Sequence, residues 1–217
     1  MTKDEIIRKL HEAKLYAILD TGYSKPEDWP RLALEFITGG VGVLQIRAKH
    51  AADDDLLAWT REILTVSAPA GVPLIINDHP AVAVSANADG CHVGQDDMPV
   101  AEVRKITGNE MIVGKSTHSL VQAIAAQKEG ADYIGFGPIF ATPTKPDYQP
   151  VGTADIQQMT RQVHIPHFCI GGVKLENCAA LHSQGVRRVV IVSGLLQSRA
   201  PSAYAQEVCR ILAGSPR

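Results

Sequence analysis

Eight short apolar runs, rich in β-branched residues, recur along the chain and are separated by longer alanine-rich segments. Near-continuous hydrophobicity of this length is typical of parallel strands that are buried on both faces. Strands that alternate with helical segments indicate repeated βα units, and eight such units can close into a barrel. The eight runs are Leu15–Leu19, Val43–Ile46, Leu74–Asn77, Gly90–Val93, Met111–Gly114, Tyr133–Gly137, His167–Ile170 and Arg188–Val192.

The segments between the runs have the spacing of helices. Residues 51–68, 119–131 and 175–186 carry apolar residues at helical intervals, and the last two place a glycine near the helix end. Residues 1–14 indicate an amphipathic N-terminal helix. We therefore predict a single α/β domain over residues 1–217, a (β/α)₈ TIM barrel of parallel strands. A doubly wound open sheet is the structural alternative, because local patterns constrain topology weakly.

Composition excludes several classes of partner. The formal net charge of −2 argues against a nucleic-acid binder that works by bulk attraction. No apolar stretch is long enough for a membrane span, and the N-terminus lacks the apolar core of a secretory signal. Four cysteines without CxxC spacing indicate buried thiols in a reducing compartment. We predict a cytoplasmic protein that acts on small molecules, with no nucleic-acid or membrane partner.

Polar residues follow the carboxyl ends of the predicted strands, where barrel enzymes place their sites. After the second run, the period-two spacing of Gln45, Arg47 and Lys49 puts three polar side chains on one face of extended chain. Together they can hold an anion and hydrogen-bond a polar ring. The alternative is that the two cations are solvated surface residues.

Two acidic positions follow the third and fourth runs. Asp78 comes after Asn77, and Asp97 lies in the loop after the fourth run. Converging carboxylates oppose each other's ionisation unless a cation joins them, and Mg²⁺ commonly links one or two carboxylates to a phosphate. The alternative for Asp96 or Asp97, ahead of Met98, is a turn-forming or capping role.

The remaining strand ends carry features suited to phosphate. The fifth run leads into Ser116, and the sixth opens a proline-stiffened loop with Thr142, Thr144 and Lys145, whose hydroxyls and ammonium are phosphate donors. The seventh run leads into a glycine pair and the eighth into a Val-Ser pair, each just before a predicted helix start. The backbone there can approach a phosphate closely. An ordinary loop or turn remains the alternative at each position. The terminal positions are Gly171, Gly172, Val192 and Ser193.

These motifs together resemble the thiamine-phosphate synthase family. QIRAK resembles its Q-x-R-x-K, IIND its Asn-Asp motif, GCHVGQDDMP its G-x-H-x-G-Q-x-D-x-P, and GFGPIFATPTKPD its most specific loop. The likeness runs from roughly the first strand to the last helix. It implies a transferase that joins 4-amino-2-methyl-5-(diphosphooxymethyl)pyrimidine to a thiazole phosphate, releasing pyrophosphate and forming thiamine phosphate.

The resemblance also assigns roles to residues. It implies one Mg²⁺ held by Asp78 and Asp97, and a dissociative reaction in which Lys49, Lys145 and Ser116 are the catalytic groups. The pyrimidine diphosphate would be bound by Gln45, Arg47, Lys49, Asn77, Ser116 and Lys145. The thiazole phosphate would be bound by Thr142, Pro143, Thr144, Gly171, Gly172, Val192 and Ser193.

The sequence departs from the family pattern at Lys115, and two other functions compete with the one that the resemblance implies. Lys115 stands where the family usually has an apolar residue, but strand alternation turns it away from Ser116. We interpret His118 as a packing or capping residue. The rivals are the related thiazole tautomerase, which needs no diphosphate site, and a non-catalytic barrel that binds a phosphorylated metabolite. The oligomeric state is left open, and a homo-oligomer is compatible with the sequence.

Overall fold

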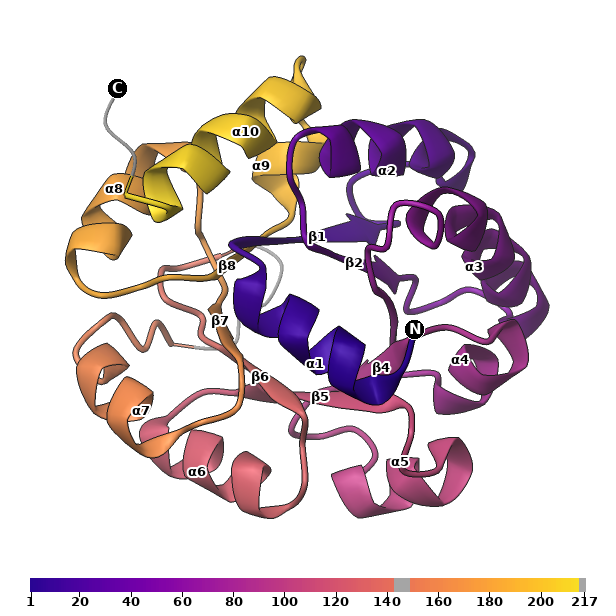
Figure 1. The fold of residues 1–217 in the computed structure, drawn as a ribbon, viewed down its shortest axis with the longest axis horizontal. Helices are drawn as coiled ribbons and strands as arrows, with labels where there is room; N and C mark the ends of the chain where they lie inside the picture. The colour runs from indigo at the N-terminus through magenta and orange to yellow at the C-terminus, as the bar shows by residue number, and fades with distance from the viewer. Residues whose placement is uncertain (143–148, 215–217) are drawn as a thin grey trace.

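Eight parallel strands close into a barrel in the computed structural model, which describes residues 1–142 and 149–214. Each strand pairs with the next along the chain, and β8 returns to β1, where Val189 pairs with Leu15 (Figure 1). The predicted barrel is thereby confirmed, and the open sheet is excluded. The strands are β1 Leu15–Asp20, β2 Val43–Arg47, β3 Leu74–Asn77, β4 Gly90–Val93, β5 Ile112–Thr117, β6 Tyr133–Phe136, β7 His167–Cys169 and β8 Val189–Ile191.

Helices surround the barrel on its outside, as Figure 1 shows. The three segments predicted to be helical contain α3 Asp53–Ser67, α6 Leu120–Lys128 and α8 Leu175–Ser183. The others follow the remaining strands, and a short 3₁₀ turn at Pro26–Asp28 precedes α2. They are α2 Trp29–Thr38, α4 Pro80–Ala86, α5 Val100–Thr107, α7 Ile156–Gln162, α9 Ser193–Leu196 and α10 Pro201–Leu212.

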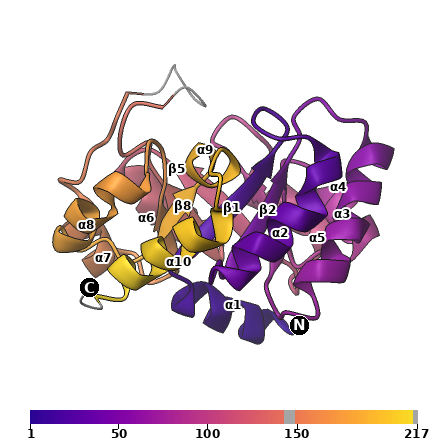
Figure 2. The ribbon, with the colours of Figure 1, turned by 90° about the horizontal axis from the view of Figure 1, so that it is seen from above.

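The predicted N-terminal helix is α1, Lys3–Glu12, and it closes one end of the barrel (Figure 2). Thr2 is the N-cap of α1 and forms a capping box with Glu5. The two side chains accept backbone N–H groups at the start of the helix. The buried side chains of Ile6 and Leu10 pack with the apolar side chains of the barrel interior. A larger core fills the space between the strands and the outer helices. With one end closed by α1, the opposite end is left to form a site.

Strand β5 is longer than the sequence predicted and runs to Thr117. It gains these residues because Ser116 and Thr117 pair with Gly135 and Phe136 of β6. Alternation turns Lys115 outward, where its ammonium lies 3.2 Å from a carboxylate oxygen of Glu129. The predicted orientation of Lys115 is therefore confirmed, while Ser116 points inward from a strand rather than from a loop.

Within residues 1–142 and 149–214, no helix is both long and apolar enough to cross a bilayer.

Candidate active site

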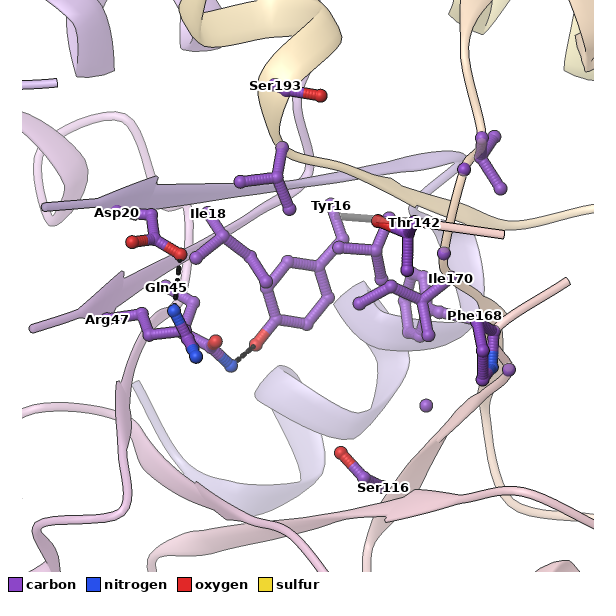
Figure 3. Close-up of a pocket in the computed structure, with 18 of the residues that line it drawn as sticks. Tyr16, Ile18, Asp20, Gln45, Arg47, Ser116, Thr142, Phe168, Ile170 and Ser193 are labelled. Carbon is purple, nitrogen blue, oxygen red and sulfur yellow. Dashed lines mark hydrogen bonds and ion pairs between the residues drawn. The ribbon is translucent and has the colours of Figure 1, made fainter. Parts of the chain in front are cut away.

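A cavity of about 520 Å³ opens where the strands reach their carboxyl ends (Figure 3). It is lined by side chains from β1 to β8 and from the loops after them. Nine of the predicted site residues contribute to this lining, so the topology brings together positions up to 148 residues apart in the chain. They are Gln45, Arg47, Asn77, Ser116, Thr142, Gly171, Gly172, Val192 and Ser193.

Arg47 is held in place by Asp20, the last residue of β1. One Arg47 guanidinium nitrogen lies 2.7 Å from an Asp20 carboxylate oxygen, and the other Asp20 oxygen accepts the backbone N–H of Gly22 at 2.8 Å (Figure 3). Asp20 is only 2% exposed, and these partners offset the cost of burying its carboxylate. Asp20 was not predicted as a site residue from the sequence, although its place directly after the first predicted strand was a sufficient signal.

A buried chain of hydrogen bonds crosses the floor of the cavity. The Gln45 amide nitrogen donates to the Tyr16 hydroxyl at 2.8 Å, and this hydroxyl lies 3.0 Å from that of Tyr133. The Tyr133 hydroxyl lies 2.9 Å from Nδ1 of His92, whose Nε2 lies 3.0 Å from Oγ of Ser116. Burial raises the pKa of both phenols, which therefore stay protonated. The three interior members, Tyr16, Tyr133 and His92, were not predicted as site residues from the sequence.

The two predicted carboxylates lie together beside the cavity. Burial, and then the neighbouring Asp97 carboxylate, raise the pKa of Asp78 to about 6, while Lys49 and Arg47 act in the opposite direction. Asp78 has a left-handed backbone, with φ of 63°, which aspartate tolerates better than most residues. Asp97 also accepts the backbone N–H of Gly94 at 2.8 Å, so the predicted turn-forming role is present as well.

Of the two lysines predicted at this mouth, Lys49 lies among the residues that the structure describes and Lys145 does not. Lys49 is exposed after β2 and, like the two carboxylates, is not among the described residues that line the cavity. Pro143, Thr144 and Lys145 lie outside the described residues, so their predicted roles stay predictions.

The turn after β7 is joined to the loop after β6 by backbone hydrogen bonds. The N–H of Ile139 donates to the Ile170 carbonyl at 2.8 Å, and that of Phe140 donates to Gly171 at 3.0 Å. Gly171 and Gly172 have φ of 91° and 64°, which favour glycine. A Cβ at Gly172 would lie 2.6 Å from the Phe140 Cβ, so these glycines also make room for the neighbouring loop.

Two further polar side chains support the loops around the cavity. Asn177 of α8, also missed from the sequence, donates to the Gly172 carbonyl at 2.9 Å and holds the glycine turn against its helix. The His118 ring contacts the Gly137 carbonyl, joining the ends of β5 and β6. The contacts of His118 agree with the packing role that we predicted for it.

Fold and cavity define the class as a (β/α)₈ barrel with its site at the carboxyl ends of the strands. A sequence model of the family described as "Thiamine monophosphate synthase" matches residues 15–195. The chain belongs to this family. The match extends from the first residue of β1 into α9, and thus includes every strand of the barrel.

Named relatives and solved structures agree with this membership. The chain is 40% identical over 194 residues to a thiamine-phosphate synthase of Shouchella clausii, covering 89% of this chain and 93% of the relative. It is 40% identical over 188 residues to that of Halalkalibacterium halodurans, covering 86% and 89%. The solved thiamine phosphate pyrophosphorylase of Pyrococcus furiosus superposes with a TM-score of 0.85 at 27% identity, covering 94% and 98%.

Proposed function

We propose that this chain is a transferase that joins 4-amino-2-methyl-5-(diphosphooxymethyl)pyrimidine to a thiazole phosphate, giving thiamine phosphate and pyrophosphate. Its membership of the family and its relatives' names support the reaction. The observation that carries the proposal is the convergence, around one cavity mouth, of an anchored arginine, an acidic pair and a glycine turn. One site thus offers separate places for a diphosphate and a second phosphate.

The pyrimidine diphosphate would occupy the side of the cavity nearest β2, β3 and β5. Arg47 has its orientation fixed by Asp20, which lowers the cost of ordering its guanidinium for an anion. Gln45 and Ser116 line the cavity, as does Asn77 at the end of β3. We assign them to the pyrimidine ring and the proximal phosphate, with Lys49 and Lys145 adding positive charge at the mouth.

The acidic pair suits one Mg²⁺. Burial and then the Asp97 carboxylate raise the pKa of Asp78, and a bound cation would offset both effects. Two carboxylates are fewer ligands than Mg²⁺ needs, so the ion would take its other ligands from phosphate and water. Asp78 and Asp97 would hold the ion. Once bound, Mg²⁺ would neutralise charge on the diphosphate.

The chemistry we infer is a dissociative substitution. The bond between the pyrimidine methylene carbon and the diphosphate oxygen breaks, and its electron pair leaves with the diphosphate. The thiazole nitrogen then donates its lone pair to the methylene carbon. No nucleophilic side chain is needed, so this chain's groups act by alignment and by stabilising the departing anion. Arg47, Lys49, Lys145 and Ser116 are the groups that would face it.

The thiazole phosphate would lie on the opposite side, against the turn after β7 and the start of α9. Gly171 and Gly172 let backbone approach the phosphate, and Ser193 begins α9 at the cavity wall (Figure 3). Val192 and Thr142 complete the described part of this side. We assign Pro143 and Thr144 to the same phosphate from the sequence motif alone.

Product analysis distinguishes this proposal from its rivals. Purified protein is incubated with both substrates and Mg²⁺, and thiamine phosphate and pyrophosphate are measured together. We expect them in equal amounts. A tautomerase would convert a thiazole phosphate with no pyrimidine present, and a binding protein would retain ligands without any product. Either outcome would overturn the proposal.

A further inference from the structure

Only the bond from Gln45 to Tyr16 has a fixed donor, and the remaining bonds as far as Ser116 can all follow its direction. A neutral tyrosine carries one hydroxyl proton, so a phenol that accepts from one neighbour has its own proton to give to the next. Gln45 donates its amide N–H to Tyr16, which leaves the Tyr16 proton for Tyr133. Tyr133 in turn has its proton for Nδ1 of His92.

The direction continues through the imidazole. A neutral imidazole whose Nδ1 accepts must carry its proton on Nε2, and Nε2 lies 3.0 Å from the Ser116 hydroxyl oxygen. Ser116 then accepts from His92 and keeps its own hydroxyl proton for another partner. At the other end, Gln45 has committed its amide nitrogen to Tyr16, and its carbonyl oxygen remains an acceptor.

We propose that Tyr16, Tyr133 and His92 form a polarity relay, which fixes Ser116 as a hydrogen-bond donor and Gln45 as an acceptor toward the ligand in the cavity. The inference rests on the proposed function, because it names the pyrimidine diphosphate as that ligand. The three relay members act as positioning residues. Their effect on the ligand passes through Gln45 and Ser116.

The interior of the barrel is shaped to hold this relay. Tyr16 and Tyr133 are 2% and 1% exposed, so water does not compete strongly for their hydroxyls. Gly114 pairs with Tyr133 across β5 and β6, and a Cβ at Gly114 would lie 2.2 Å from the tyrosine ring. The ring therefore needs a glycine at this neighbour.

The relay also explains polar side chains that apolar packing alone would not select. The Tyr16 and Tyr133 rings pack edge-on against Phe168, and a phenylalanine at either position would keep that packing. Phenylalanine would remove only the hydroxyl. The test can therefore break the relay with little change to the core.

Tyr133→Phe cuts the relay at its centre without touching a group that we assign to the ligand. Affinity for the pyrimidine diphosphate, measured by calorimetry with Mg²⁺, should fall about tenfold, the usual scale for a disturbed buried hydrogen bond. The ¹⁵N NMR signals of His92, assigned with His92→Gln, should show protonated Nε2 and unprotonated Nδ1 in the wild type. In Tyr133→Phe this preference should be lost.

Ser116→Ala separates a relay from a general effect on packing. Tyr133→Phe leaves the bond from Gln45 to Tyr16 in place, so its effect should pass through His92 and Ser116. Adding Tyr133→Phe to Ser116→Ala should therefore weaken binding less than twofold further. Thr60→Val is the matched control, since it removes a buried hydroxyl whose bond to the Leu56 carbonyl lies within α3. The control should keep both the wild-type affinity and the His92 tautomer.

Several results would overturn the relay. One is wild-type affinity for the pyrimidine diphosphate in Tyr133→Phe. Another is a double variant in which the two single losses of affinity multiply fully. The third is a wild-type His92 that is protonated on Nδ1 alone. If Tyr133→Phe fails to fold, Tyr16→Phe removes the acceptor of the Gln45 amide instead. Affinity for the pyrimidine diphosphate should again fall about tenfold, and wild-type affinity in that variant would overturn the relay. Failure of the proposed function is distinguishable, because the wild type would then form no thiamine phosphate, whereas the His92 tautomer is read without turnover.

Discussion

Among single residues, Asp20 shows how a buried charge can serve a neighbour at the site. Its carboxylate is almost fully buried and is divided between the Arg47 guanidinium and the Gly22 N–H. A buried carboxylate is costly unless it is paired, so its presence at the cavity wall indicates that the orientation of Arg47 matters there.

Asp20→Asn tests this interpretation. Asparagine can still accept the Gly22 N–H, but it loses the charge that holds Arg47. We expect KM for the pyrimidine diphosphate to rise about tenfold, with a smaller change in KM for the thiazole phosphate. Steady-state kinetics with each substrate varied in turn makes the comparison. Equal changes in the two KM values would mean that Asp20 supports the barrel in general.

The acidic pair makes a second prediction at the scale of residues. Asp78→Asn and Asp97→Asn each keep the side-chain shape but remove an anionic ligand, so turnover should fall and more Mg²⁺ should be needed. Because both residues would hold one ion, the double variant should lose much less than the product of the single losses. Pyrophosphate release against Mg²⁺ concentration is the measurement.

The control for the acidic pair is the fold of all four proteins, followed by circular dichroism. Multiplicative losses with an unchanged Mg²⁺ dependence would contradict a shared ion. Asp97 would then keep only the turn-forming role that its bond to Gly94 already shows.

At the scale of elements, the turn after β7 and the loop after β6 behave as one unit. We predict that Gly172→Ala lowers turnover strongly, because its Cβ would collide with Phe140 and displace that loop. Gly130→Ala is the control. It has a similar positive φ of 87° but open space around its Cβ, so it carries the backbone strain without the collision. An equal loss of turnover in the two variants would show that backbone strain, and not the collision with Phe140, lowers turnover. Wild-type turnover in Gly172→Ala would contradict the prediction.

Helix α1 gives a prediction about stability rather than activity. Leu10 is fully buried at the closed end of the barrel, so Leu10→Ala should lower the free energy of unfolding by about 2–5 kcal/mol. Turnover of the folded fraction should stay near that of the wild type, because the cavity lies at the other end. Urea unfolding and steady-state assays measure the two effects. Leu34→Ala, at a side chain that is 58% exposed, should change stability little.

For the whole molecule, the sequence predicted the barrel well because buried parallel strands and amphipathic helices carry strong local patterns. The strand-end rule also placed Gln45, Arg47 and Ser116 at one cavity. It could not find Tyr16 or Tyr133, because an inward phenol in an apolar strand looks like any core aromatic. Their roles depend on hydrogen bonds between strands distant in sequence, and these appear only once the barrel closes.

We propose that the open end of this barrel is the site where thiamine phosphate is made. Gly135→Val tests it, because Gly135 lines the cavity and a Cβ there meets only ordinary contacts, so the added methyl groups should enter the ligand space. Thiamine phosphate and pyrophosphate are measured together for wild type and variant. We predict equal products from the wild type and roughly hundredfold less from a folded variant. Wild-type turnover in Gly135→Val, or no thiamine phosphate from the wild type, would contradict the account.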